Sequence, residues 1–203
     1  MKRRGRRGTQ AEERPIQEAM AALGVRVREV WVYDGFKVNA SAPVRGCMGV
    51  TEGFLCADPW RQSAILAHEA GHARLRHTVK AVAVAVVLEA GLVACRVAAA
   101  PWIVLGPGPF TAGLAGVMAA EVGVWVAVAA LGRSHEYAAD RWAVERGGIT
   151  EGVYQVHLAA LHHPPTVTLW NRLLATHPTP ERRAARLTRW LRGRRHTHLQ
   201  GVG

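Results

Sequence analysis

The stretch "ILAHEAGHARLRH", residues 65–77, contains the pattern His-Glu-x-x-His. His68 and His72 are four residues apart, so on a helix they project from one face and can bind one metal ion. Neutral imidazoles suit zinc. Glu69 lies next to the first histidine, where its carboxylate can accept a proton from a water on the zinc. Because five-letter matches also occur by chance, the rest of the chain must supply a third ligand.

The stretch "HEYAAD", residues 135–140, offers that ligand. A catalytic zinc needs three protein ligands and an open position, and Glu136 is the candidate for the third. Asp140 follows one turn later and can accept a hydrogen bond from a ligand histidine, which fixes the tautomer of the ring. The alternative is two exposed helix carboxylates. Beside the His-Glu-x-x-His pattern, the sequence predicts one Zn²⁺ per chain at His68, His72 and Glu136.

Two long apolar stretches, residues 81–105 and 110–132, surround a "GPGP" breaker at residues 106–109. At about 1.5 Å per helical residue, each is long enough to cross a hydrocarbon core of about 30 Å. We therefore predict a transmembrane helical hairpin at residues 81–132. The alternative is a pair of buried, Ala-rich helices in a soluble bundle.

Three charges within this hairpin, Glu89, Arg96 and Glu121, favour the soluble alternative. Each would cost about 2.5–3.5 kcal/mol at a bilayer centre if it were unpaired. A chain that folds back at the Gly/Pro breaker brings Arg96 close to Glu121, however. We expect these two side chains to pair, with Glu89 as a further partner of Arg96.

The charge of the chain is strongly positive, with a net charge of +11 and a pI near 10.9. The basic residues lie mainly at the two ends of the chain. The basic C-terminal helix lacks the interleaved aromatic residues of a base-stacking platform, so we expect contact with anionic lipid and no specific nucleic acid. Basic residues also flank the hairpin on both sides, which predicts an inner or cytoplasmic membrane protein whose active site faces the cytoplasm.

The remaining sequence predicts a mainly helical fold with a small sheet. We expect a basic, disordered N-terminus at residues 1–9, a single domain at 10–193 that holds the hairpin, and a disordered tail at 194–203. Strands are predicted at 25–33, 36–41 and 46–55, and the helix that holds the histidine motif at about 61–78. His77 would point away from the ligand face of that helix and be solvated. The three cysteines form no CxxC pair, which fits a reducing compartment.

Taken together, "HEAGH", two apolar spans, "EYAAD" and "THPTPERRAARL" make the chain resemble the HtpX-like zinc metalloendopeptidases, a family that includes the CAAX prenyl endoproteases. The resemblance covers roughly residues 39–187. It implies a zincin-type metallopeptidase domain that acts on protein or peptide substrates. "NAS" at 39–41 and "GCMGVTEGFL" at 46–55 stand where the family has an Asn-Ala pair and a short strand.

The resemblance implies several residue roles, of which only that of Glu136 is also indicated by the spacing. Glu136 would be the third zinc ligand, and the strand at Gly49, Val50 and Thr51 would pair with an extended substrate. His177, in the late His-Pro motif, would donate a hydrogen bond to the oxyanion, and Arg183 would orient groups near the metal. Read without the resemblance, His177 is simply a histidine before proline in a loop.

The chain departs from the HtpX pattern at its start, because no apolar spans precede the catalytic helix. Two alternatives therefore stay open. "AHEAGHARLRH" also resembles the soluble ImmA-like metallopeptidases, although the long segment between His72 and Glu136 counts against that assignment. The second alternative is a zinc-binding membrane adaptor without activity. Glu69 counts against it, because a structural zinc site needs no base.

Overall fold

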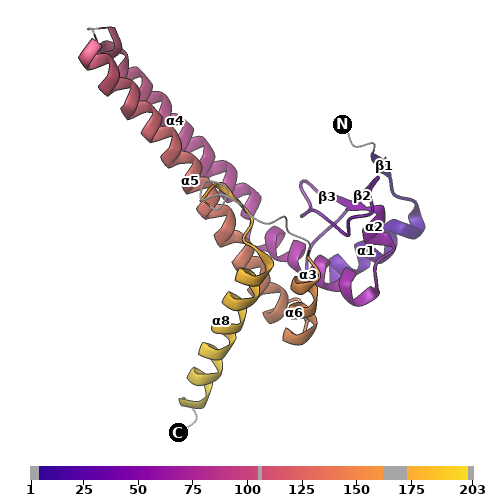
Figure 1. Ribbon diagram of the computed structural model, residues 1–203. Helices are drawn as coiled ribbons and strands as arrows, with labels where there is room; N and C mark the ends of the chain where they lie inside the picture. The colour runs from indigo at the N-terminus through magenta and orange to yellow at the C-terminus, as the bar shows by residue number, and fades with distance from the viewer. Residues whose placement is uncertain (1–4, 105–106, 162–172, 201–203) are drawn as a thin grey trace. The chain divides into compact units, whose positions relative to one another are not determined.

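The computed structural model describes residues 5–104, 107–161 and 173–200, which are mainly helical with one small sheet (Figure 1). The chain forms two compact units. The first consists of Met1–Thr78, His135–Pro164 and Pro178–Gly203, and the second of Val79–Ser134 and Pro165–His177. The predicted fold class is confirmed, and the second unit holds the apolar stretches that were expected to form a hairpin.

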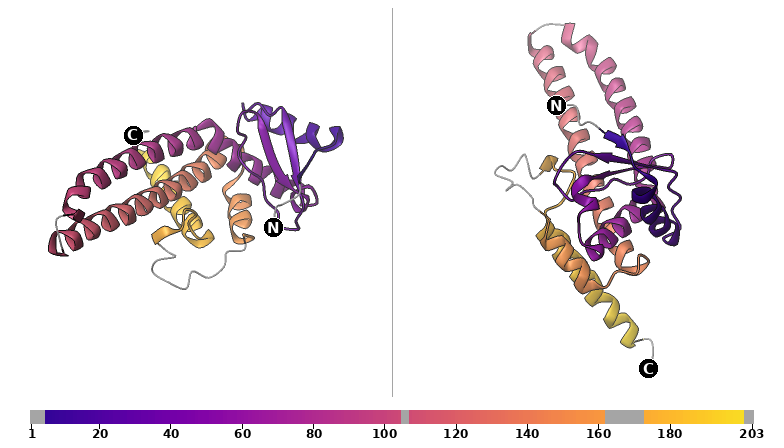
Figure 2. Two further views of the ribbon diagram at one scale, coloured as in Figure 1. Left: turned by 90° about the horizontal axis from the view of Figure 1, so that it is seen from above. Right: turned by 90° about the vertical axis from the view of Figure 1, so that its right-hand side faces the viewer.

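The sheet of the first unit has three strands in the order β1 (Gly5–Arg7), β2 (Glu29–Tyr33) and β3 (Cys47–Thr51) (Figure 2). β1 runs antiparallel to β2, whereas β3 runs parallel to it. Side chains alternate between the two faces of a strand. The face that carries Val30 and Val32 from β2 and Met48 and Val50 from β3 is therefore the buried one.

The central helix of this unit is α3 (Pro59–Arg74), which begins with proline at its first turn. One side of α3, with Ile65, Leu66 and Ala70, packs in a single core with the sheet, α1 (Gln10–Ala22) and α2 (Glu52–Leu55). Its other side, with Ala64 and Ala67, packs in a second core. This position between two cores leaves α3 little freedom to move.

The second core is built from α3 and three later elements of the chain. These are the C-terminal end of α5 (Pro107–Glu145), α6 (Glu151–Ala159) and α8 (Pro180–Gln200). Tyr154, Leu158 and Leu187 are fully buried in it. The histidines of α3 therefore face segments that lie far away in the sequence.

The helix predicted at about 61–78 is broken in the structure. α3 ends at Arg74, and α4 (His77–Val104) begins three residues later. Arg76 between them has a φ of 54°, in the left-handed region. That conformation interrupts the i to i−4 hydrogen bonds and changes the direction of the chain.

Disorder was predicted for residues 1–9, and the prediction is wrong for Gly5–Arg7, which form β1. The Arg6 guanidinium donates to both carboxylate oxygens of Glu12, at 2.8 and 2.7 Å. Glu12 in turn accepts from the Thr9 amide at 2.7 Å and caps α1. The bond from Arg6 is the main reason that the pKa of Glu12 falls to about 2. A basic run was expected to be disordered, although Arg6 and Arg7 pair with carboxylates of α1.

Other predicted boundaries are also corrected. The strand expected at 46–55 ends at Thr51, whose side chain caps α2 by accepting from the Phe54 amide. The strand expected at 36–41 is reduced to a single bridge from Ala40 to Val50. The tail expected at 194–203 continues α8 to Gln200, because one glycine at 193 costs a helix only about 1 kcal/mol and Arg194 pairs with Glu145. Residues 201–203 lie outside the described residues.

The second unit contains the apolar parts of α4 and α5, which lie side by side in Figures 1 and 2. By length and composition, His77–Pro101 and Gly113–Glu145 could each cross a membrane, and only 6% of each apolar window is buried. Arg96 Nη2 donates to Glu121 Oε1 at 2.6 Å, and Glu89 Oε1 lies 3.8 Å from Arg96 Nη1. The predicted pairing of these three charges is confirmed.

Candidate metal centre

Three side chains from two helices of the first unit bring their ligand atoms within 4.8 Å of one another: His68, His72 and Glu136. The Nε2 atoms of the two histidines are 3.0 Å apart. Glu136 Oε2 lies 3.3 Å from His68 Nε2, and its Oε1 lies 3.5 Å from His72 Nε2. Two imidazole nitrogens and one carboxylate that face a common point form a donor set that can hold a divalent cation such as zinc.

Gly71 allows this close approach of α3 and α5. A Cβ atom at Gly71 would lie 3.1 Å from the Cα and the carbonyl oxygen of Ala139 on α5. That is tighter than ordinary van der Waals contact, so a side chain here would push the two helices apart. Because Glu136 lies one turn before Ala139, the glycine determines how near the third ligand comes to the two histidines.

Asp140 fixes the orientation of the first histidine. His68 Nδ1 lies 3.0 Å from Asp140 Oδ1 and 2.9 Å from the Tyr154 hydroxyl. The Tyr154 hydroxyl itself donates to Asp140 Oδ1 at 2.7 Å, so its oxygen is left to accept. A proton on His68 Nδ1 satisfies Asp140 and leaves Nε2 as the ring atom that faces Glu136 and the position of a metal ion. Asp140 is where the sequence expected it, whereas no local pattern identified Tyr154.

Arg183 of α8 balances the two buried carboxylates. Its Nε donates to Asp140 Oδ2 at 2.9 Å and its Nη2 to Asp140 Oδ1, while Nη1 lies 3.3 Å from Glu136 Oε2. Burial would raise the pKa of Asp140, but the charge of Arg183 and the hydrogen bonds from His68 and Arg183 together outweigh burial and hold this pKa below its usual range. The same pairing raises the pKa of Arg183 despite its burial. The buried cluster is thus compensated from within.

The charge states of the motif residues follow from the same surroundings. Burial lowers the pKa of His68, but the carboxylates bonded to its ring outweigh burial and raise the pKa to about 9. A cation bound at Nε2 would have to compete with a proton there. For Glu69, which is partly buried beside these histidines, burial raises the pKa, and the positive charges of His68 and His72 oppose that rise.

His77 is not the solvated residue that the sequence predicted. It is 5% exposed, and its Nδ1 lies 2.9 Å from His72 Nδ1. On an unbroken helix the fifth residue beyond His72 would point elsewhere, but the break at Arg76 turns the ring back. The His77 ring also stacks on His135, with centroids 4.1 Å apart. His77 thus occupies the side of His72 that is opposite to Glu136.

The outer edge of β3 is not open to a substrate, which corrects the expectation for Gly49, Val50 and Thr51. The Ser41 amide donates to the Gly49 carbonyl at 2.9 Å, and the Thr51 amide donates to the Asn39 carbonyl at 3.0 Å. The backbone of Ala40, between these two residues, is directed away from β3, because successive residues of an extended chain alternate their hydrogen-bonding direction. The segment at 39–41 therefore forms the outer edge of the sheet on this side.

His177 belongs to the second unit and is exposed. The residues before it pack at the end of the apolar part of α5. Arg133 Nη1 donates to the Leu173 and Ala175 carbonyls at 2.9 and 2.8 Å, and Thr176 covers Gly132. The role of His177 as an oxyanion donor stays a prediction.

The family is decided by a sequence comparison. The model of peptidase family M48 matches residues 9–191. The chain belongs to peptidase family M48. The resemblance to the HtpX-like peptidases is thereby confirmed, and this M48 chain has a histidine and glutamate group that could hold a metal ion.

A solved structure extends the comparison to the fold. The crystal structure of S. mikatae Ste24p is similar with a TM-score of 0.64 at 15% sequence identity. The similarity covers 91% of this M48 chain and 51% of the Ste24p chain, so the present chain spans about half the length of that protein. At this identity the likeness shows the fold alone. No curated protein matches the sequence.

Proposed function

We propose that the chain is a zinc-dependent endopeptidase, anchored in a membrane by its apolar hairpin, with an active site that faces the cytoplasm. One observation carries the proposal. His68 and His72 of the motif meet Glu136 from a helix more than sixty residues later, and Asp140 and Arg183 orient and neutralise that set. Membership of peptidase family M48 supplies the reaction class.

Zinc held by His68, His72 and Glu136 would supply Lewis-acid activation of water and of the substrate carbonyl. The protein contributes the orientation of these ligands. Asp140 keeps the proton of His68 on Nδ1, and Arg183 holds the carboxylates of Glu136 and Asp140 in place. The contact of His77 Nδ1 with His72 Nδ1 restrains the second ring in the same way. Each ligand is therefore supported by a neighbour on its far side.

Glu69 is the proposed general base. Its carboxylate would accept a proton from the attacking water and then donate that proton to the amine nitrogen that leaves. Burial raises the pKa of Glu69, which makes the carboxylate a stronger base than an exposed glutamate. His177 is proposed to donate a hydrogen bond to the oxyanion of the substrate.

An extended peptide substrate would bind by adding to the sheet edge at residues 39–41. The amide and carbonyl of Ala40 are directed outwards, whereas the outward groups of β3 are already bonded to this segment. Backbone pairing of this kind recognises the extended shape of a peptide and tolerates many sequences. The substrate is therefore proposed to pair with Ala40, and not with Gly49–Thr51.

The membrane anchor is supported by the exposure of the apolar helices. A soluble bundle would bury its Ala- and Val-rich surface, but Val86, Val87 and Val97 are 63%, 70% and 69% exposed. Basic residues flank the hairpin on both sides, which favours a cytoplasmic location for both flanks. These residues are Arg74, Arg76 and Lys80 before it, and Arg133, Arg141 and Arg146 after it.

The decisive experiment uses the full chain purified in a mild detergent. We expect about one zinc per chain, cleavage of casein, loss of cleavage with a chelator and recovery with added zinc. Glu69→Gln should retain zinc and lose about 10²–10⁴-fold in turnover, which is the usual contribution of a general base. Glu18→Gln, an exposed glutamate on α1, is the matched control. Full activity in Glu69→Gln would remove the assigned base.

Location is tested separately. The chain should stay in membranes after a carbonate wash, and a membrane-impermeant maleimide should label the exposed Cys47 and Cys56 only after the cells are opened. Recovery in the salt-washed soluble fraction would favour a soluble ImmA-like protease. A zinc-loaded chain that cleaves no member of a peptide library would favour the adaptor.

A further inference from the structure

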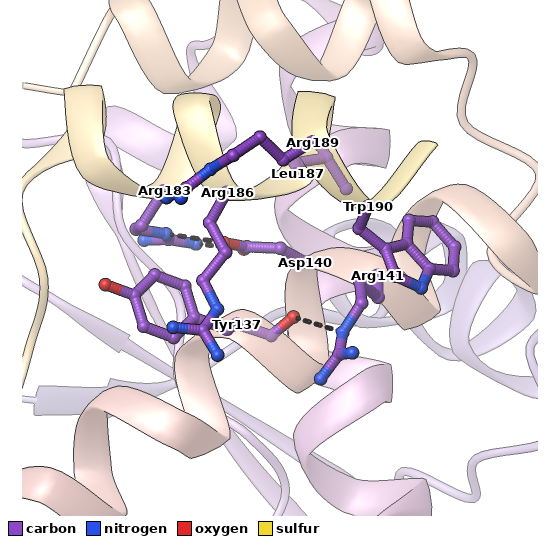
Figure 3. A pocket seen from close by; sticks show the side chains of 8 residues that line it. All are labelled: Tyr137, Asp140, Arg141, Arg183, Arg186, Leu187, Arg189 and Trp190. Atoms are coloured by element: carbon purple, nitrogen blue, oxygen red, sulfur yellow. Dashed lines mark hydrogen bonds and ion pairs between the residues drawn. The ribbon is translucent and has the colours of Figure 1, made fainter. Parts of the chain in front are cut away.

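A pocket of about 380 Å³ opens between the C-terminal end of α5 and α8, within the first unit (Figure 3). Tyr137 and Arg141 line it from α5. Arg183, Arg186, Arg189 and Trp190 line it from α8. None of His68, His72 and Glu136 lines this pocket, although Asp140 in its wall contacts His68 and pairs with Arg183.

The pocket carries an excess of positive charge. Arg183 is neutralised by Asp140. No ion pair joins Arg141, Arg186 or Arg189 to a carboxylate among residues 5–101, 113–161 and 173–194, whose side chains the structure places. Asp140, which precedes Arg141, pairs with Arg183, and Glu145, one turn after Arg141 on α5, pairs with Arg194. Three arginines thus face one hollow without a counter-charge.

Aromatic rings hold two of these arginines in place. The Arg186 guanidinium carbon lies 4.5 Å from the centroid of the Tyr137 ring, and the Arg141 carbon lies 6.0 Å from that of Trp190. Arg141 Nε also donates to the Tyr137 carbonyl at 3.3 Å. In Figure 3 both guanidinium groups lie in the lower part of the view, on the same side of Asp140. Stacking fixes an arginine at little cost and leaves its terminal N–H groups able to donate.

We propose that this pocket binds a phosphate group, either that of an anionic phospholipid or free phosphate. A planar guanidinium fork donates two parallel hydrogen bonds to a phosphate. Two or three such forks match the charge and the several oxygens of a phosphate better than those of a single carboxylate ligand. The observations favour a lipid source, because Tyr137 and Arg141 lie only five and nine residues beyond residue 132, where the apolar stretch of α5 ends. Basic residues next to a span are attracted to anionic head groups.

Binding can be measured without reference to peptidase activity. The full chain in a neutral detergent is titrated by calorimetry with dihexanoyl phosphatidylglycerol, with dihexanoyl phosphatidylcholine, with inorganic phosphate and with a short peptide that has a free carboxylate. Arg141→Gln/Arg186→Gln is compared with Arg182→Gln/Arg192→Gln. The control pair has the same loss of charge, and its two exposed residues do not line the pocket.

The pocket variant should bind phosphatidylglycerol at least about tenfold more weakly than the wild type, and the control pair should change by less than about twofold. Phosphatidylcholine should bind poorly, because its own cation offsets the phosphate. If only inorganic phosphate binds, and the pocket variant but not the control pair weakens that binding, the result supports a phosphate site and identifies the free ion as its ligand. Equal losses in both variants, binding of the peptide carboxylate alone, or no binding would each overturn the proposal. The unfolding midpoints of all variants show whether a loss of binding comes from a loss of the fold. The single Arg186→Lys variant keeps the charge and gives a second test of the site.

Discussion

The candidate metal centre and the apolar helices show opposite patterns of burial. Around His68 the ionisable side chains are inside, with Glu136, Asp140 and Arg183 between 1% and 8% exposed. Along the apolar parts of α4 and α5 the valines are outside, and Trp125 is 65% exposed. Buried charges are stable where every one has a partner. Exposed apolar surface is stable where the surroundings are not water. The two patterns give separate tests of the ionic cluster and of the membrane assignment.

The largest effect is expected from breaking the buried ionic cluster. Arg183→Met leaves the carboxylates of Asp140 and Glu136 buried without a cation, which should lower the free energy of unfolding by about 3–5 kcal/mol. Arg182→Met, the exposed neighbour on α8, should change it by less than about 0.5 kcal/mol. Denaturant unfolding in detergent measures both. A loss below about 1 kcal/mol in Arg183→Met would mean that water reaches the carboxylates.

The next largest effect shows whether the apolar helices lie in lipid or in water. Val87, near the middle of the first span, is 70% exposed. In a bilayer, Val87→Lys should cost about 2.5–3.5 kcal/mol and reduce the carbonate-resistant fraction. Val156→Lys, at a site on α6 that is 56% exposed, should be nearly neutral. If the two substitutions had equal and small effects, the apolar helices would face water.

A smaller effect compares two ion pairs in the two settings. Arg96–Glu121 lies between the apolar helices, whereas Arg14–Glu18 lies on the surface of α1 and is 75% and 65% exposed. Double-mutant cycles to alanine should give a coupling energy of about 0.3–0.5 kcal/mol for the surface pair. The hairpin pair should couple by roughly 1–2 kcal/mol, because each partner left alone would stay in apolar surroundings. Equal coupling energies would contradict a low-dielectric location.

The smallest effect is a pH dependence near the ionic cluster. Burial, followed by the positive charges of His68, Arg183 and Arg61, lowers the pKa of His157 from 6.5 to about 4. The unfolded chain therefore binds a proton at a higher pH than the folded chain does. The contribution of His157 to the free energy of unfolding is therefore complete above pH 6.5 and is lost as the pH falls towards 4. At pH 5.5 the free energy of unfolding should be lower by roughly 1 kcal/mol. His157→Gln should unfold with a weaker dependence on pH over this range than the wild type does.

Several features could be predicted because they depend on residues close together in sequence. The spacing of His68 and His72 places them on one face of any helix. The lengths of the two apolar stretches predict two long helices, and the breaker between them predicts the Arg96–Glu121 pair. Gly147-Gly148 marks the end of α5, with a φ of 71° at Gly148. Each of these features follows from local geometry.

Other features could not be read locally. Tyr154 has no motif of its own and reaches Asp140 only because α6 packs on α3. His77 was assigned to solvent because the left-handed turn at Arg76, a residue type that rarely adopts it, was not foreseen. The occupied edge of β3 depends on hydrogen bonds with Asn39 and Ser41, which lie twelve and eight positions before their partners Thr51 and Gly49. β1 is ordered by its pairing with β2 and by the ion pairs of Arg6 and Arg7 with Glu12 and Glu13 on α1.

The sequence by itself determined which chemical groups are present and which of them share a helix face, since a helix repeats every 3.6 residues whatever surrounds it. It therefore supplied His68, Glu69 and His72 as a unit, and two apolar spans as another. Tertiary structure decided which distant groups meet that unit. Glu136, Asp140, Tyr154 and Arg183 come from three other helices, and their positions depend on how α3 packs between two cores, which no short stretch of sequence specifies.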